Sequence, residues 1–431
     1  MRRMIAAAVA LLAVAAIAMV AYQAGLRQRD YRISVLRGDA ALASDQTFAA
    51  IEAYSGAIAL RPESMLGYLR RGETYRRRAD RGDLEAAARD FRKAAELDPS
   101  VITPLEQLGD VSYQLQQYDR AIDAYERAIR LDDRSARMNY KLALARFRSG
   151  DINRAISDLH QTLRLDDRLA DAHYLLGLCL RAKHQSAEAL RALEKAILAS
   201  PTLIPAREEL AALYGVLDRR KEQLEQLQML AMLDRQHVQR HIAVGLAQAR
   251  ARRWDAAVMT LRSALESHGD DPSLYRALGQ VWLDSAQVPG DRIEVSKARE
   301  ALDRAASSPD ATSETLMLAG RAALVDGDDD TAERLLQQAT ERFPIDPEAL
   351  LLYANVAEGR SHADAARRAI IEYVTLVEDD STFVANAARI AGLSFRAGDA
   401  ETAAHWIKRG LDRDPQNAQL AALAKRIEKQ P

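Results

Sequence analysis

The sequence predicts an all-α repeat solenoid, and three observations lead to that prediction. A pattern of small and large apolar residues recurs about every 34 residues over most of the 431-residue chain. Each period has room for two short amphipathic helices with a turn between them. The composition, 48% hydrophobic and 28% charged, is that of a folded chain, and it excludes a disordered or multi-span membrane protein.

Charge and cysteine content exclude further classes. The 60 Lys and Arg residues nearly balance the 62 Asp and Glu residues, and the resulting formal net charge of -2 argues against a general nucleic-acid binder. Cys179 is the only cysteine, which excludes an intrachain disulfide and a cysteine zinc cluster. For the same reason there is no lipobox cysteine behind the N-terminal apolar run.

The first element in chain order is an apolar N-terminal helix. Arg2 and Arg3 precede an uninterrupted apolar run over residues 4–22, which as a helix would extend roughly 28 Å, close to the hydrocarbon thickness of a bilayer. Residues 1–24 are therefore predicted to form a single-pass transmembrane signal anchor. The short basic tail favours a body outside the cytoplasm, in the periplasm. A cleaved secretory signal is the alternative, because residues 16–18 read Ala-Ile-Ala, a pattern that a signal peptidase accepts.

The repeats follow, over about residues 31–417. Their register is set by a small residue in the first helix and, in most units, an alanine in the second. Eleven such pairs occur: Gly38 with Ala50, Gly72 with Ala87, Gly109 with Ala121, Ala143 with Ala155, Gly177 with Ala189, Ala211 with Gln223, Gly245 with Ala257, Gly279 with Ala298, Gly320 with Ala332, Ala354 with Ala366, and Ala391 with Ala403. We expect neighbouring helices to cross closely at these small residues.

A large residue comes four positions after the second small residue of most units, and we expect it to fill the hollow that the first small residue leaves. These large residues are Tyr54, Phe91, Tyr125, Leu159, Leu193, Leu227, Leu261, Leu302 and Leu336. Prolines at the ends of second helices remove an N–H group and so stop the helix. They are Pro62, Pro99, Pro201, Pro344 and Pro415.

Two intervals are longer than the rest. The stretch between Gly72 and Ala87 carries three extra residues, and that between Gly279 and Ala298 carries seven, which include residues 288–291. Such insertions are expected to form loops on one face of a solenoid. The last segment, 418–431, is predicted to be a capping helix with apolar residues on one face and charges on the other.

The third unit shows which family the repeat is similar to. Leu105, Leu108, Gly109, Ala121, Tyr125 and Ala128 follow the spacing W-x2-L-G-x2-Y, A-x3-F-x2-A, with Asp133 at the position of Pro. The sequence thus resembles the tetratricopeptide repeat (TPR) family. That resemblance implies a right-handed superhelical solenoid, whose first helices line a long concave surface at their second, fifth, ninth and twelfth positions.

In the fourth and fifth units, these implied positions combine aromatic residues with arginines, the composition of binding hot spots. They are Arg137, Tyr140, Leu144 and Phe147, then Asp171, Tyr174, Leu178 and Arg181. We expect a peptide or helix of a partner protein to bind this partner-binding groove. The alternative is that these residues only pack against the neighbouring unit.

A cluster of arginines in the second unit, near the predicted anchor, could contact anionic headgroups or an acidic polysaccharide. Its members are Arg70, Arg71, Arg76, Arg77, Arg78 and Arg81. The competing interpretation is a solvated arginine-rich face, because Glu73, Asp80, Asp83 and Glu85 are interleaved with these arginines.

The sequence predicts no enzyme, no cofactor and no metal site. It contains no glycine-rich nucleotide loop, nucleophile elbow, His-Glu-x-x-His or EF-hand motif. His237 and His241 are four residues apart, but no third ligand is evident. The carboxylates between Asp326 and Asp330 are better explained as an acidic turn that caps a helix than as a calcium site.

The functional prediction is therefore a non-enzymatic scaffold that binds proteins at a membrane. Similarity to membrane-anchored bacterial TPR proteins implies a role in cell-envelope assembly, secretion or polysaccharide export. A module that guides an anionic polysaccharide along its groove is the alternative.

Overall fold

The computed structural model describes residues 2–286, 292–377 and 379–427, without the side chains of residues 2–10, 13 and 381. Within these ranges there are 23 helices and no strand. The chain divides into two compact units, Met1–Leu213 and Tyr214–Pro431. The predicted all-α helical repeat is thereby confirmed.

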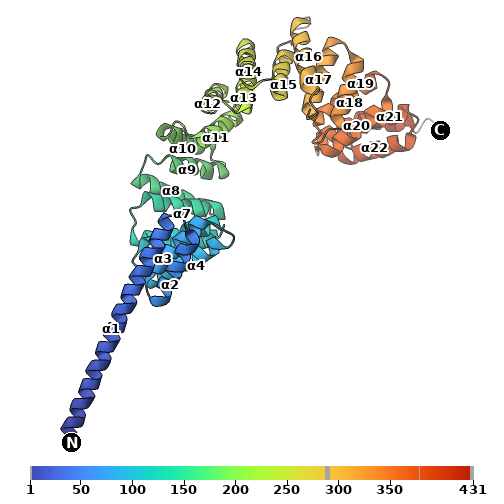
Figure 1. The fold of residues 1–431 in the computed structure, drawn as a ribbon. Helices are drawn as coiled ribbons and strands as arrows, with labels where there is room; N and C mark the ends of the chain where they lie inside the picture. Colours follow the sequence, from blue (N-terminus) through green and yellow to red (C-terminus); the bar gives the residue numbers. More distant parts are fainter. Residues whose placement is uncertain (1, 287–291, 378, 428–431) are drawn as a thin grey trace. The chain divides into compact units, whose positions relative to one another are not determined.

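The first unit contains ten helices and most of an eleventh (Figure 1). They are α1 (Arg2–Ala43), α2 (Thr47–Leu60), α3 (Met65–Arg78), α4 (Asp83–Leu97), α5 (Ile102–Gln114), α6 (Tyr118–Leu131), α7 (Ala136–Ser149), α8 (Ile152–Leu165), α9 (Ala170–Ala182), α10 (Ser186–Ala199) and α11 (Ile204–Val216).

The second unit continues the same alternation of first and second helices. Its elements are α12 (Arg220–Leu233), α13 (Val238–Arg250), α14 (Trp254–His268), α15 (Pro272–Ser285), α16 (Arg292–Ala306), α17 (Ser313–Asp326), α18 (Asp329–Thr340), α19 (Pro347–Gly359), α20 (Ala363–Leu376), α21 (Asp380–Arg396), α22 (Ala400–Arg413) and α23 (Ala418–Ile427). The predicted insertion at 288–291 lies outside the described residues.

Two kinds of turn join the helices: one connects the first and second helices of a unit, and the other connects a second helix to the next unit. In each turn from a first to a second helix that the structure describes in full, at least one residue adopts the left-handed conformation, which shortens the connection and reverses the chain. The non-glycine residues there are Asp45, Ala79, Gln116, His184, Asp218, Arg252 and Ser361, and the glycines include Gly150, Gly327 and Gly398. The predicted helix-stopping prolines lie two to four residues after the ends of α2, α4, α10, α18 and α22.

The core is built from the small and large residues of each pair. A Cβ atom added to the first-helix glycine would lie within 3 Å of the large side chain of the second helix in seven units, so the predicted packing is confirmed there. The pairs are Gly38 with Tyr54, Gly72 with Phe91, Gly109 with Tyr125, Gly177 with Leu193, Gly245 with Leu261, Gly279 with Leu302, and Gly320 with Leu336. At the C-terminal end, Leu420 of α23 is fully buried in the last core cluster.

The predicted N-terminal anchor is wrong. Among the residues that the structure describes, no helix is both long and apolar enough to cross a membrane. In α1 the described apolar side chains from Leu11 to Tyr22 are followed by Arg27, Arg29 and Asp30 within the same continuous helix, whereas a span needs about 20 consecutive apolar residues. The same finding overturns the predicted single-pass membrane localisation. Part of the prediction, residue 1 and the side chains of residues 2–10 and 13, lies outside the described residues.

Candidate functional site

The predicted groove residues lie on the first helices α7 and α9 of the first unit. Their spacing of three, four and three residues places them along one face of each helix. Arg137, Asp171 and Arg181 are exposed, and the apolar and aromatic members are half-buried. We call this set, together with Tyr113 and Arg148 described below, the first-helix face.

Several apolar members of the first-helix face also serve the core. Tyr140, Leu144, Phe147 and Leu178 pack against a buried cluster that includes Leu159. Each is nevertheless partly exposed, so one side of the side chain stabilises the fold while the other meets solvent. The two interpretations offered by the sequence, binding and packing, therefore describe two sides of the same residues.

Tyr113 of α5 extends this face, although the groove prediction did not include it. Its hydroxyl oxygen accepts a hydrogen bond from Arg148 Nε at 3.3 Å. Its ring meets that of Tyr118 edge-on, with centroids 5.6 Å apart. Tyr113 occupies the same repeat position as Phe147, 34 residues and one unit earlier. The groove prediction would have included Tyr113 if it had been extended to the third unit.

Tyr140 and Tyr174 of this face are neutral at ordinary pH, because both have a raised pKa. Burial, followed by the nearby charge of Asp171, raises the pKa of Tyr140 to about 12. Burial also raises the pKa of Tyr174, although the guanidinium groups of Arg181 and Arg148 oppose that shift. Neutral phenols offer an apolar ring together with a hydroxyl donor, which suits the recognition of a peptide.

Charges surround the aromatic residues unevenly. Lys141 Nζ lies 2.7 Å from Glu106 Oε1 and 2.8 Å from both carboxylate oxygens of Asp110. Arg181 is paired with Glu209. Arg148, in contrast, has no carboxylate partner among the described residues, and it donates a hydrogen bond to the hydroxyl oxygen of Tyr113. This guanidinium is therefore available to a carboxylate from outside the chain.

The arginine cluster of the second unit is largely neutralised within the fold. Arg71 makes two hydrogen bonds to Asp90, at 2.7 and 2.8 Å, and Arg78 makes two to Asp83, at 2.6 and 2.8 Å. The contacts of two others, Arg70 with Glu73 and Arg77 with Asp45, are also ion pairs. No ion pair of Arg76 or Arg81 occurs in the described part of the chain.

The structure gives the remaining candidate residues other partners. His241 Nε2 lies 3.1 Å from the carbonyl oxygen of Arg235 in the preceding turn, and its ring lies beside that of His268. Asp328 caps α18 by accepting a hydrogen bond from the Thr331 N–H group at 3.1 Å. Within the described ranges, no group of three or more His, Cys, Asp or Glu residues could hold a metal ion.

The only cysteine is a packing residue. Cys179 is fully buried in α9 among the core residues around Leu159. Burial raises the pKa of its thiol to about 12, which keeps it protonated and unreactive at neutral pH.

Comparisons with known proteins agree with the helix-pair repeat. A TPR repeat model matches residues 109–150, and a tetratricopeptide repeat model matches residues 35–102, 140–204 and 317–381. Together these matches cover more than half of the chain. No curated protein matches it.

Several solved structures are similar in part. The MamA protein is 25% identical over 40% of this chain and 93% of that one, with a TM-score of 0.38. YrrB, described as a TPR protein with an unusual peptide-binding site, is 22% identical over 47% of this chain and 100% of that one, with a TM-score of 0.37. Yeast Tom70 is 13% identical over 94% of this chain and 100% of that one, with a TM-score of 0.41. Because models of this repeat match more than half of the chain, the chain belongs to the tetratricopeptide repeat family.

Proposed function

We propose that the protein is a non-enzymatic scaffold whose first-helix face binds a peptide segment of a partner protein. The observation that supports this most directly is the combination of four partly exposed aromatic rings with an arginine that has no carboxylate partner in the described part of the chain. The rings belong to Tyr113, Tyr140, Phe147 and Tyr174, and the arginine is Arg148. Aromatic residues and arginine dominate the binding energy of most protein interfaces.

The partner segment should carry an acidic side chain close to an aromatic or aliphatic one. The acidic group would pair with Arg148, and the apolar group would cover the exposed sides of the rings. Among the similar solved structures, YrrB is described as having an unusual peptide-binding site, and another structure holds Naa15/Naa10 bound to HypK-THB. We infer a comparable use of this chain from its own aromatic residues.

Guidance of an anionic polysaccharide has less support. Most arginines of the second-unit cluster already pair with carboxylates, so they offer little net positive charge to a polymer. Roles in envelope assembly, secretion or polysaccharide export rest on the predicted anchor, which the described residues do not support.

Selection from a displayed random-peptide library on the purified chain tests the proposal. We expect the enriched peptides to share an acidic residue and an apolar residue, and their affinity to fall about tenfold with Tyr174→Ala or Arg148→Glu. Arg130→Glu is a matched control, because Arg130 is an exposed arginine of the second helix α6. No enrichment, or equal binding by Arg148→Glu and the original chain, would refute this function.

A further inference from the structure

The second helices carry grooves of their own, and these recur at equivalent repeat positions. In the first unit, one groove of about 450 Å³ lies between α4 and α6, and another of about 500 Å³ lies between α8 and α10. A third, of about 610 Å³, lies between α12 and α14 in the second unit. Residues that line one groove recur in the next groove 68 residues later, which is two repeats. One such series is Arg92, His160 and Gln228, and another is Leu108, Leu176 and Val244.

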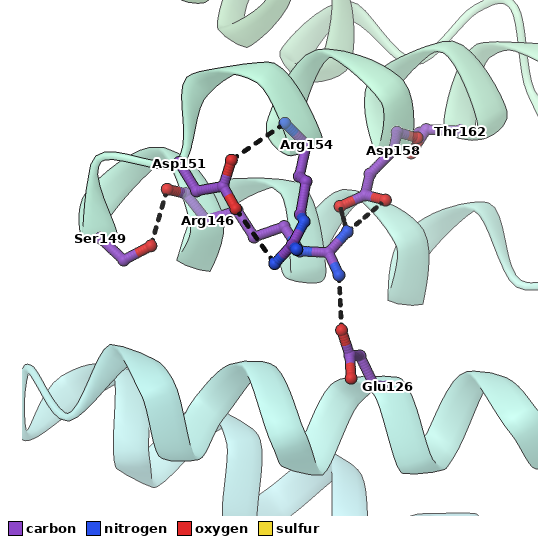
Figure 2. Close-up of polar contacts among 7 residues, drawn as sticks. All are labelled: Glu126, Arg146, Ser149, Asp151, Arg154, Asp158 and Thr162. Atoms are coloured by element: carbon purple, nitrogen blue, oxygen red, sulfur yellow. Dashed lines mark hydrogen bonds and ion pairs between the residues drawn. The ribbon is translucent and has the colours of Figure 1, made fainter.

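The corresponding place between α6 and α8 is filled. Figure 2 shows Arg146 of α7 held between two acidic side chains from the flanking second helices. Its Nη1 lies 2.7 and 2.6 Å from the two carboxylate oxygens of Asp158, and its Nη2 lies 2.5 Å from Glu126 Oε1. The Arg146 side chain is only 12% exposed, so this network occupies the space that is open elsewhere.

One repeat later, the residues of that network are replaced. His160, Leu180 and Ala192 stand 34 residues after Glu126, Arg146 and Asp158 respectively. Leucine and alanine can neither form an ion pair nor span the gap, which leaves the groove between α8 and α10 open. Its floor is apolar, formed by Leu163, Leu176, Leu180 and Ala192.

The rim of this α8–α10 groove carries an excess of positive charge. Arg191 is paired with Glu188 at 3.5 Å, and Arg164 makes its hydrogen bonds to the neutral Gln161. Lys195 has no ion-pair partner in the part of the chain that the structure describes. Asp167 is the one other acidic residue of the lining, and the remaining polar residues are His160 and His173, with His173 Nε2 2.9 Å from the Asp167 carbonyl oxygen.

We infer that the α8–α10 groove is a second docking site, which takes an acidic amphipathic helix of a partner protein. Charge complementarity selects the acidic partner, because neither Arg164 nor Lys195 pairs with a carboxylate among the described residues. The apolar floor selects aliphatic side chains on one face of that helix, in the helix-in-groove mode. The groove uses His173, Leu176 and Leu180 of α9, whereas the first-helix face uses Tyr174, Leu178 and Arg181, so one helix serves two separate sites.

A designed peptide helix tests this inference. The probe is a fluorescently labelled peptide with leucines along one face and glutamates elsewhere, and its binding is followed by fluorescence anisotropy. We expect saturable binding to the full chain that weakens about tenfold with the double variant Arg164→Glu/Lys195→Glu. Arg130→Glu should bind as the original chain does.

Closing the groove is a second test. The triple variant His160→Glu/Leu180→Arg/Ala192→Asp installs the network of Figure 2 at this position, and it should abolish probe binding. Thermal unfolding verifies that each variant is folded. If the triple variant does not fold, the double variant on the exposed rim still decides the question.

Three outcomes would overturn the inference: no saturable binding, equal binding by the double variant, or equal binding of a polyglutamate peptide without leucines. Arg148→Glu and Tyr174→Ala separate this inference from the proposed function. Both variants should leave probe binding unchanged, and a loss of binding with them would place the probe on the first-helix face instead.

Discussion

A Cβ atom at Gly109 would lie 2.3 Å from Cε1 of Tyr125, which is closer than any tolerated carbon contact. The Tyr125 ring has no easy escape, because it is 2% exposed and its hydroxyl donates a hydrogen bond to Asp110 Oδ1 at 2.7 Å. The Tyr125 ring is thus fixed by its attachment to α6 and by its hydrogen bond to Asp110 of α5. The absence of a side chain at Gly109 allows the two helices to approach this closely.

Gly109→Ala should therefore destabilise the chain. Although alanine favours helices, the added methyl group must displace a buried ring, and overpacking of this kind costs about 1–3 kcal/mol. Denaturant unfolding measures the change. Gly56→Ala in α2 is the control, because nothing lies within 4 Å of a Cβ atom there, and it should raise stability by about 0.5–1 kcal/mol. If Gly109→Ala left the free energy of unfolding unchanged, α5 and α6 would be able to move apart without cost, which would contradict this prediction.

Arg146→Met should be among the most destabilising single changes in the first unit. It leaves Asp158, whose side chain is 14% exposed, without its partner, and breaking a buried pair in this way costs about 3–5 kcal/mol. Arg154→Met is a matched control from the same region, since Arg154 is 73% exposed and 3.4 Å from Asp151. Its effect should stay below about 0.5 kcal/mol.

The cost of Arg146→Met should also depend on pH. Burial raises the pKa of Asp158 even in the intact protein, and Arg146 opposes that shift. Without Arg146, the folded state should bind a proton at Asp158 more tightly than the unfolded state does, so stability is gained as pH falls. Unfolding measured at pH 8 and pH 5 should show a smaller deficit at pH 5, and a constant deficit would contradict this account.

Arg252→Gly should raise stability. Arg252 has a φ of +57° in the turn between α13 and α14. Glycine adopts this left-handed conformation without steric strain, although it loses more conformational entropy on folding than arginine does. We expect a net gain of about 0.5–1 kcal/mol in the free energy of unfolding. The reciprocal change is Gly150→Ala, at a φ of +88° in the turn between α7 and α8. It should lower stability by about 1 kcal/mol. Melting temperatures of the two variants should move in opposite directions.

Asp328→Asn should make unfolding less sensitive to acid. Hydrogen bonds from Arg299 and then from Thr331 lower the pKa of Asp328 to about 2. A carboxylate with a lowered pKa stabilises the folded state above its ordinary pKa, near pH 4, and this contribution is lost as pH falls toward 2. The melting temperature of Asp328→Asn should thus lie below that of the original chain at pH 6, and the two should converge near pH 2. Asp329→Asn, at an exposed position, should show no such convergence.

The repeat period was sufficient to predict the fold class and the inner packing. Gly109 and Tyr125 are each recognisable from the sequence because a close helix crossing requires one small and one large residue at fixed spacing. Tyr113 was within reach of the same rule, applied one unit earlier. The predicted anchor is wrong, because no helix in the described part of the chain is both long and apolar enough to cross a membrane.

The α8–α10 groove could not be predicted in the same way. Whether it is open depends on three residues from three helices, and none of them is part of the repeat signature. Glu126, Arg146 and Asp158 look like ordinary surface charges in the sequence, and only their distances show that they fill a space. Comparison with His160, Leu180 and Ala192 becomes informative once that geometry is known.

The burial of Cys179 makes the protein convenient for spectroscopy. The single thiol is buried and protonated. Alkylating reagents should therefore not modify the natural chain under native conditions. A cysteine introduced at any exposed site would then be the sole point of attachment for a spin label or a dye. Two such labels within one unit would report the distribution of distances between its helices, and so how far the helices of that unit move relative to one another in solution.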